Sequence, residues 1–115
     1  RRENAELFVK LFKDHPNYLI QRDIDKSSWF GFSLIIRPNS KLERKNVVNI
    51  LQKNNVECRP IVTGNFVRND VMKYFDYEVH KELKNANHLH DNGFFVGNSH
   101  KCLFKNINFL SEILS

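Results

Sequence analysis

Five residues near the end of one predicted strand have the chemistry that binds anionic oxygens. They are Arg59, Thr63, Gly64, Asn65 and Arg68. Arg forks match carboxylates and phosphates with paired hydrogen bonds, and an exposed Gly-Asn backbone can donate to anionic oxygens. Glycine also adopts backbone conformations closed to other residues, which lets a ligand approach the chain closely. This pattern predicts a contact to an anion or a sugar phosphate. The alternative is an ordinary loop, in which Arg59 pairs with a neighbouring carboxylate and Asn65 holds a turn.

The histidines raise the question of a metal site, above all His88 and His90. Two histidines with this spacing on a helix point their rings about 200° apart, so they cannot chelate one ion together. Neither cysteine stands at ligand spacing, and we therefore expect no metal site. His100 follows a predicted strand and precedes a helix, which is a better position for a ligand contact; a capping or core role is the alternative.

The aromatic run Trp29–Phe32 is similar to the strand of RNA-recognition domains whose exposed rings stack on bases. The run continues into Leu34-Ile35-Ile36 without the alternation that would leave the rings on an open face. We therefore prefer core packing for these rings, and a small nucleic-acid-binding module is the alternative function. No nucleophile–base pair, phosphate-binding loop or dinucleotide fingerprint is present, so no catalytic residue is assigned.

Apolar segments predict the strands that must position these residues. The run 28–36 is short, almost continuously hydrophobic and stopped by Pro38-Asn39, as in a buried central strand. Segments 56–62 and 94–97 predict two more strands, and 18–24 predicts a connector or an edge strand. The helical segment between the first two strands indicates that they are neighbours, with a helix covering one face.

Apolar residues at helical spacing predict the helices. A long N-terminal helix is expected over 1–14, and because it has no N-cap we expect that its beginning was cut off. Ser40 and Glu43 have the spacing of a capping box, which predicts a helix over 40–54. Its expected inward-facing residues are Leu42, Val47, Ile50 and Leu51.

The second half of the chain is predicted to be more irregular. Asn69-Asp70 is expected to cap a short helical turn, and 79–90 to form a polar helix. Asn92-Gly93 predicts a turn before the third strand. A last helix carries the apolar stripe Leu103, Ile107, Leu110 and Leu114.

The composition indicates one folded domain and restricts function little. The chain has 115 residues, of which 41% are hydrophobic and 27% charged, with a net charge of +5. Basic residues are spread along the whole chain, so the charge does not distinguish nucleic acid, lipid or phosphorylated ligands. Two cysteines without CxxC spacing favour a reducing, cytoplasmic setting, and no apolar run approaches the roughly 20 residues that span a bilayer.

Four motifs in register resemble a known family. They are Ser-Ser-Trp-Phe-Gly-Phe at 27–32, Ser-Lys-Leu-Glu-Arg at 40–44, Arg-Pro-Ile-Val-Thr-Gly-Asn at 59–65 and Phe-Phe-Val-Gly-Asn at 94–98. Together they resemble the C-terminal small domain of DegT/DnrJ/EryC1/StrS-type PLP-dependent nucleotide-sugar aminotransferases and dehydrases. The Arg-Pro and Gly-Asn elements, followed by Arg68, most resemble the branch that contains CDP-4-keto-6-deoxy-glucose 3-dehydrase.

The resemblance implies an α+β fold of the α/β class, namely the small domain of a fold type I transferase. We expect a small, mainly antiparallel sheet of about three to four strands covered by helices. The large domain that carries pyridoxal phosphate and its Schiff-base lysine (a histidine in dehydrases) would be missing from residues 1–115, and no lysine here takes that role. The fragment alone is then expected to bind no cofactor and to be inactive.

The resemblance also implies a function, a ligand and partners. The intact protein would be a cytoplasmic homodimer of deoxysugar and surface polysaccharide biosynthesis, acting on a nucleotide-diphosphate sugar. The small domain closes over that substrate and meets its own large domain, in part through one face of the first helix. The residues implied near the substrate are Thr63, Gly64, Asn65 and Arg68, joined by Arg59 and His100. Neither amination nor dehydration is favoured, because the cofactor-holding residue lies outside the sequence.

Overall fold

A four-stranded antiparallel sheet forms the centre of the protein in the computed structural model, which describes residues 1–115. The strands are β1 (Tyr18–Ile20), β2 (Gly31–Ile36), β3 (Cys58–Arg59) and β4 (Gly93–Gly97), in the order β1-β2-β4-β3. This arrangement confirms the expected α+β fold with its small antiparallel sheet. The segment after residue 18 forms an edge strand, one of the two alternatives considered for it.

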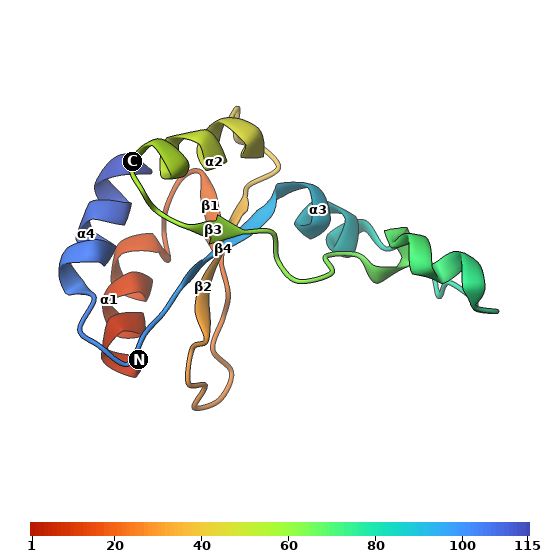
Figure 1. Ribbon diagram of the computed structural model, residues 1–115, viewed down its shortest axis with the longest axis horizontal. Helices are drawn as coiled ribbons and strands as arrows, with labels where there is room; N and C mark the ends of the chain where they lie inside the picture. The colour runs from red at the N-terminus through yellow and green to blue at the C-terminus, as the bar shows by residue number, and fades with distance from the viewer.

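One face of the sheet is buried under two helices. Phe32, Leu34 and Ile36 alternate along β2 and are at most 2% exposed, and Phe94 of β4 pairs with Leu34 on the same face. Helices α1 (Arg2–Phe12) and α4 (Phe104–Ile113) lie side by side over this face (Figure 1). The ring of Phe8 in α1 stacks on Phe32 with 4.4 Å between centroids. The predicted core strand and both terminal helices are therefore confirmed.

A buried asparagine joins the two helices at one end. The amide Nδ2 of Asn4 donates to Asn98 Oδ1 at 3.1 Å, to the Ser99 carbonyl at 3.2 Å and to the Lys101 carbonyl at 2.8 Å. Its Oδ1 accepts from the Leu103 N–H at 3.0 Å. A buried polar group is stable only with such partners, and this one fixes the loop after β4 against α1.

The predicted capping box of the second helix is wrong. Helix α2 (Arg44–Lys53) has Glu43 as its N-cap residue, and no side chain caps it. The Ser40 hydroxyl instead donates to Asn17 Oδ1 at 3.0 Å, so a tertiary contact replaces the expected cap. Of the four residues expected to face inward, Val47 and Leu51 are buried, whereas Leu42 and Ile50 are exposed.

The second and third predicted strands are not neighbours, contrary to the expectation from the sequence. Strand β4 lies between β2 and β3 and pairs with both of them in antiparallel orientation. Strand β3 has two residues instead of the expected seven-residue run 56–62, and it ends before Pro60. Proline has no N–H to donate, which stops the hydrogen-bonded ladder there.

Strand β2 also begins later than predicted, because the aromatic run folds inward. Trp29 has a φ of 50°, and its indole N–H donates to Asp23 at 3.2 Å. Trp29 and Phe32 are 4% and 1% exposed, whereas Phe30 is 72% exposed. Core packing is thus confirmed for two of the three rings. Of this run only the Phe30 ring is open to the stacking that the nucleic-acid alternative requires.

Residues 66–83, which we call the arm, project away from the sheet (Figure 1). The arm contains the short 3-10 helices η1 (Phe66–Arg68) and η2 (Asp70–Tyr74), and Asn69 caps η2 as the sequence predicted. Helix α3 (Lys84–Asn92) returns the chain to the sheet and runs directly into β4, so the predicted turn at Asn92-Gly93 is not formed. The helix also starts five residues later than predicted, at 84 instead of 79.

Exposed apolar side chains gather on the arm and not on α1. The exposed apolar residues of the arm are Phe66, Val71, Tyr74, Phe75, Tyr77 and Val79. Ala5, Phe8 and Phe12 of α1 are buried, and its other apolar residues pack against the core. The first helix therefore has no fully exposed apolar side chain, and its expected contact with a further domain stays a prediction. Both cysteines are free, and no helix has the length and apolar character needed to cross a membrane.

A half-buried histidine stabilises the connection between α1 and β1. The ring of His15 lies 5.6 Å from that of Phe12 and 4.9 Å from that of Tyr18. Its Nδ1 accepts the N–H of Asn17 at 3.1 Å, which requires an unprotonated Nδ1. Burial, and secondly the nearby Arg37 guanidinium, lower the pKa of His15 from its ordinary value of 6.5.

The stability of the protein should therefore fall as the pH decreases below 6.5, the ordinary pKa of this group. In that range unfolded His15 binds a proton more readily than folded His15, so protons favour the unfolded state. Urea unfolding at a series of pH values measures the effect. His15→Asn keeps an acceptor for Asn17 but cannot titrate, and its curve should fall less steeply. The same pH dependence in both proteins would show that His15 carries no part of it.

Candidate functional site

The segment after β3, which we call the Gly-Asn loop (residues 61–68), has an unusual backbone. Thr63 and Gly64 have φ values of 56° and 52°. The N–H of Gly64 donates to the carbonyls of Ile61 at 3.0 Å and Val62 at 2.7 Å. The left-handed conformation expected of the glycine is confirmed. Thr63 adopts the same left-handed conformation, although a β-branched residue is strained in it by about 1–3 kcal/mol.

Asn65 is buried and fully occupied within the protein. Only 5% of it is exposed, its Nδ2 donates to Asn87 Oδ1 at 2.9 Å, and its Oδ1 accepts from the Val67 N–H at 3.2 Å. The second of these bonds caps η1. Asn65 therefore holds a turn, as the alternative for this loop proposed. Its backbone N–H donates to His90 Nδ1 at 3.1 Å, and the Gly64 N–H is also bonded within the chain, so the predicted backbone donation to an anion is wrong. A role of Asn65 toward a ligand would pass through the position of its neighbours.

Arg68 points outward from the same loop. Its guanidinium forms an ion pair with Asp91 at 2.9 Å, and the two side chains are 41% and 54% exposed. An exposed pair of this kind contributes little to stability. The structure therefore leaves Arg68 reachable by a ligand, next to a buried anchor at Asn65.

Arg59 lies on the open face of the sheet. Its Nε and Nη2 both donate to Glu57 Oε1, at 3.0 and 2.7 Å. Arg59 therefore pairs with a neighbouring carboxylate, as the alternative interpretation of an ordinary loop predicted. Both side chains are largely exposed. They line a groove of about 350 Å³ together with Phe30, Phe95 and Asn98.

An aromatic pair separates this groove from a second one. The rings of Phe30 and Phe95 are 6.2 Å apart and tilted by 45°. On their other side a groove of about 270 Å³ contains Ile61 and Val62 from the start of the Gly-Asn loop. The open sheet face thus combines a guanidinium, two aromatic rings and the start of the Gly-Asn loop.

His100 does not join this arrangement. It is exposed and lines a separate groove with Arg1, Arg2, Glu3 and Ser28, beside the start of α1. The structure therefore brings together Thr63, Gly64, Asn65 and Arg68 in one loop and places Arg59 on the adjacent sheet face. It leaves His100 elsewhere.

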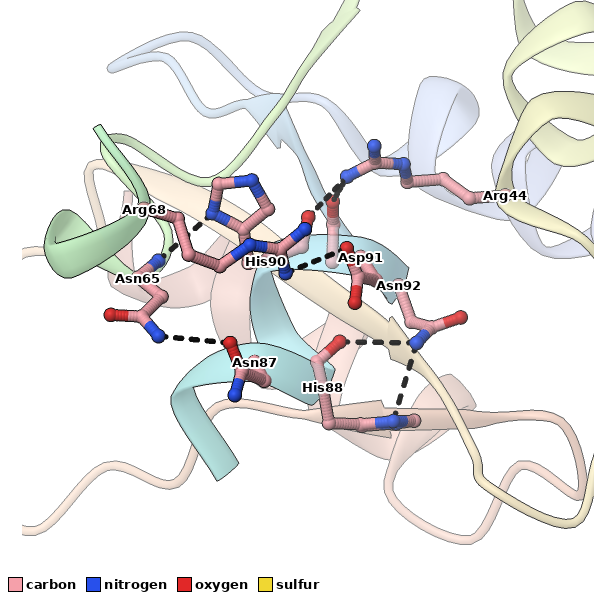
Figure 2. A network of polar contacts seen from close by, with 9 residues as sticks. Arg44, Asn65, Arg68, Asn87, His88, His90, Asp91 and Asn92 are labelled. Atoms are coloured by element: carbon pink, nitrogen blue, oxygen red, sulfur yellow. Dashed lines mark hydrogen bonds and ion pairs between the residues drawn. The ribbon is translucent and has the colours of Figure 1, made fainter. Parts of the chain in front are cut away.

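The sequence analysis missed the residues that hold the loop (Figure 2). They lie on α3, where Asn87 and His90 contact Asn65 and where Asp91 pairs with Arg68. The spacing of these α3 residues, three and four apart, places them on one helical face and was the available signal. The expectation that His88 and His90 do not converge is confirmed, since His88 Nε2 lies 2.8 Å from the Ile36 carbonyl instead.

The residues of this chain do not form a site for pyridoxal phosphate. All eleven lysines are exposed, and Lys10, Lys13 and Lys26 line an open groove beside α1. None has the buried ammonium group from which a Schiff base readily forms. Arg59 could bind a phosphate group, and Phe30 and Phe95 lie beside it, but no lysine lines the grooves next to these rings. Any such cofactor would have to be held by residues outside this chain.

Comparisons with known proteins identify relatives of the whole chain. Residues 1–102 match the DegT/DnrJ/EryC1/StrS aminotransferase family. The GDP-4-keto-6-deoxy-D-mannose 3-dehydratase of Escherichia coli O55:H7 is 53% identical over 115 residues. That match covers 99% of this chain but 30% of the relative, so the chain spans about three-tenths of the length of the proteins it matches.

Solved structures of such an enzyme have the same fold. The E. coli GDP-4-keto-6-deoxy-D-mannose 3-dehydratase with bound hydrated PLP gives a TM-score of 0.97 at 52% identity. The match covers 100% of this chain and 30% of that one. A mutant of the GDP-4-keto-6-deoxymannose 3-dehydratase with bound GDP-perosamine matches over the same shares, also with a TM-score of 0.97 and 52% identity.

The position of Gly64 gives a test of the loop geometry. A Cβ there would lie 2.6 Å from His90 Nδ1, in addition to the strain of a φ of 52°. Gly64→Ala should lower the free energy of unfolding by about 1–3 kcal/mol.

Gly97→Ala is the matched control for this substitution, because nothing lies within 4 Å of its added Cβ. It should change the free energy of unfolding by less than about 0.5 kcal/mol. Chemical denaturation measures both variants. Equal effects of the two substitutions would contradict the described packing of Gly64 on His90.

Proposed function

The chain belongs to the DegT/DnrJ/EryC1/StrS aminotransferase family, and from this premise we propose that it is the C-terminal small domain of a nucleotide-sugar 3-dehydratase. The observation that carries the proposal is the match of the whole chain to a solved 3-dehydratase, at 52% identity and a TM-score of 0.97. At this identity the two chains share their loops as well as their core. The proposed substrate is a GDP-linked 4-keto-6-deoxy sugar, the class named for that relative.

The remaining part of the intact protein would hold the cofactor. Pyridoxal phosphate supplies an electron sink for the sugar chemistry when it is bound. The residues of this chain bind and orient the substrate and exclude water from it. The exposed apolar side chains of the arm are then covered in the intact enzyme, which we propose to be a cytoplasmic homodimer.

The open sheet face and the Gly-Asn loop have the chemistry that a nucleotide sugar requires. Arg68 and Arg59 present exposed guanidinium groups that can bind diphosphate oxygens in paired hydrogen bonds. Phe30 and Phe95 offer two aromatic rings next to Arg59. This combination suits a ligand that joins a charged diphosphate to planar or apolar rings. We therefore assign substrate binding to the loop and this face.

Dehydration is proposed over amination because two relatives, at 53% and 44% identity, are named as 3-dehydratases. The experiment supplies the intact protein with pyridoxal phosphate, glutamate and GDP-4-keto-6-deoxymannose. Mass spectrometry and NMR should detect a product without the hydroxyl at carbon 3. Transfer of an amino group to the sugar would contradict this assignment, and the absence of any reaction would contradict the proposed substrate. The 115-residue chain alone should show neither turnover nor a bound cofactor.

The outward position of Arg68 predicts a specific kinetic effect. Arg68→Ala should raise KM for the nucleotide sugar about ten- to hundredfold, because a charged hydrogen bond to the substrate is lost. The free energy of unfolding should change by less than about 1 kcal/mol, since the pair with Asp91 is exposed.

Two variants control for indirect effects in the same kinetic assay. Asp91→Asn weakens the ion pair but keeps the guanidinium, and Arg22→Ala removes an exposed arginine outside the site. Both should leave KM within about threefold of the unmodified enzyme. Equal losses in Arg68→Ala and Asp91→Asn would show that Arg68 acts through its ion pair and does not touch the substrate.

A further inference from the structure

The Gly-Asn loop is held in place by helix α3. The backbone N–H of Asn65 donates to His90 Nδ1 at 3.1 Å, and its side chain donates to Asn87 at 2.9 Å. Arg68 adds the ion pair with Asp91 at 2.9 Å. Three successive contacts of the loop therefore end on a single helical face, which Figure 2 shows together.

His90 supports the loop in two ways at once. Its Nδ1 accepts the Asn65 N–H, so the neutral ring carries its proton on Nε2. The same ring packs directly on Gly64, where an added Cβ would lie 2.6 Å from Nδ1 and 2.9 Å from Cγ. One half-buried side chain thus contacts both residues at the centre of the loop, including the one in the left-handed conformation.

The backbone of His90 is itself fixed from another element. The Arg44 guanidinium on α2 donates to the carbonyl of His90 at 2.7 Å and to that of Gly93 at 3.2 Å. These carbonyls lie where α3 ends and β4 begins, and a cation is favourable at a helix C-terminus. The position of the ring is therefore set relative to both α2 and the sheet.

We propose that His90 is a positioning residue for nucleotide-sugar binding, because it fixes the Gly-Asn loop in the conformation that presents Arg68 to the substrate. This inference rests on the proposed function of the loop. His90 does not touch the substrate, and its contribution passes through Asn65 and Gly64. The adjacent His88 has a different task, since its ring bonds the carbonyl of Ile36 in the sheet.

Two substitutions separate this role from a general structural one. Asparagine at position 90 places its Oδ1 near the Nδ1 position and can still accept the Asn65 N–H, whereas glutamine places its amide near Nε2. Helix propensity ranks glutamine above asparagine. A purely helical role therefore predicts that His90→Gln is the milder change, and the positioning role predicts that His90→Asn is milder. Asn85→Ala, at an exposed position of the same helix, is the matched surface control.

The experiment measures kinetics and hydrogen exchange in the intact holoenzyme. His90→Gln should raise KM for the GDP sugar about tenfold with kcat nearly unchanged, and should speed exchange in peptides that cover residues 64–68 by about the same factor. His90→Asn and Asn85→Ala should remain within about threefold of the unmodified enzyme in both measurements.

The outcomes distinguish the effect of His90 on the loop from the role of the loop in binding and from the identity of the substrate. Unchanged exchange in His90→Gln, or a larger loss in His90→Asn than in His90→Gln, overturns the positioning role. Faster exchange without a change in KM shows that His90 fixes the loop but that the loop does not bind the sugar, which overturns the inference and the proposed role of the loop together. A loss confined to kcat also overturns the inference. Activity on a different substrate, with the exchange effect retained, leaves His90 fixing the loop and refutes the proposed substrate alone.

Discussion

Burial of one sheet face under α1 and α4 is the constraint on which the rest of the structure depends. Phe32, Leu34 and Phe94 alternate inward, so that the residues between them must face the other way. Ser33 and Phe95 form part of that open face, and Arg59 lies beside Phe95 across the β3–β4 pairing. Hydrophobic burial on one side therefore determines which polar and aromatic groups are available on the other.

The Gly-Asn loop divides its residues between anchoring and exposure. Asn65 satisfies its polar atoms inside the protein, while Arg68 keeps most of its donors in solvent and shares one with Asp91. The strained backbone at Thr63 persists because these contacts over-determine the conformation. The Gly-Asn loop can present Arg68 at a defined position, because the contacts of Asn65 fix its backbone to helix α3.

The sequence predicts most elements of this fold but few of the contacts between them. Continuous apolar character identifies β2, and helical spacing identifies α1 and α4, since both signals are local. Ser40 is misjudged because its hydroxyl bonds Asn17, which is distant in sequence. The role of His90 is missed for the same reason, as it meets Asn65 across 25 positions. The left-handed conformation of Gly64 is predicted well, because glycine adopts it without steric cost, whereas the same conformation at Thr63 has no such signal in the sequence.

The order of the strands has a consequence for synthesis of the protein. Strands β2 and β3 are separated in the sheet by β4, which the ribosome delivers last of the three. Until residues 93–97 emerge, β2 can pair only with β1, and β3 has no neighbour at all. Until then the nascent chain therefore carries unpaired strand edges and an apolar face that only α1 can cover, and helix α4 is added later still. Such a chain is exposed to wrong pairing with other nascent chains, and its four-stranded sheet can assemble only after β4 has been synthesised.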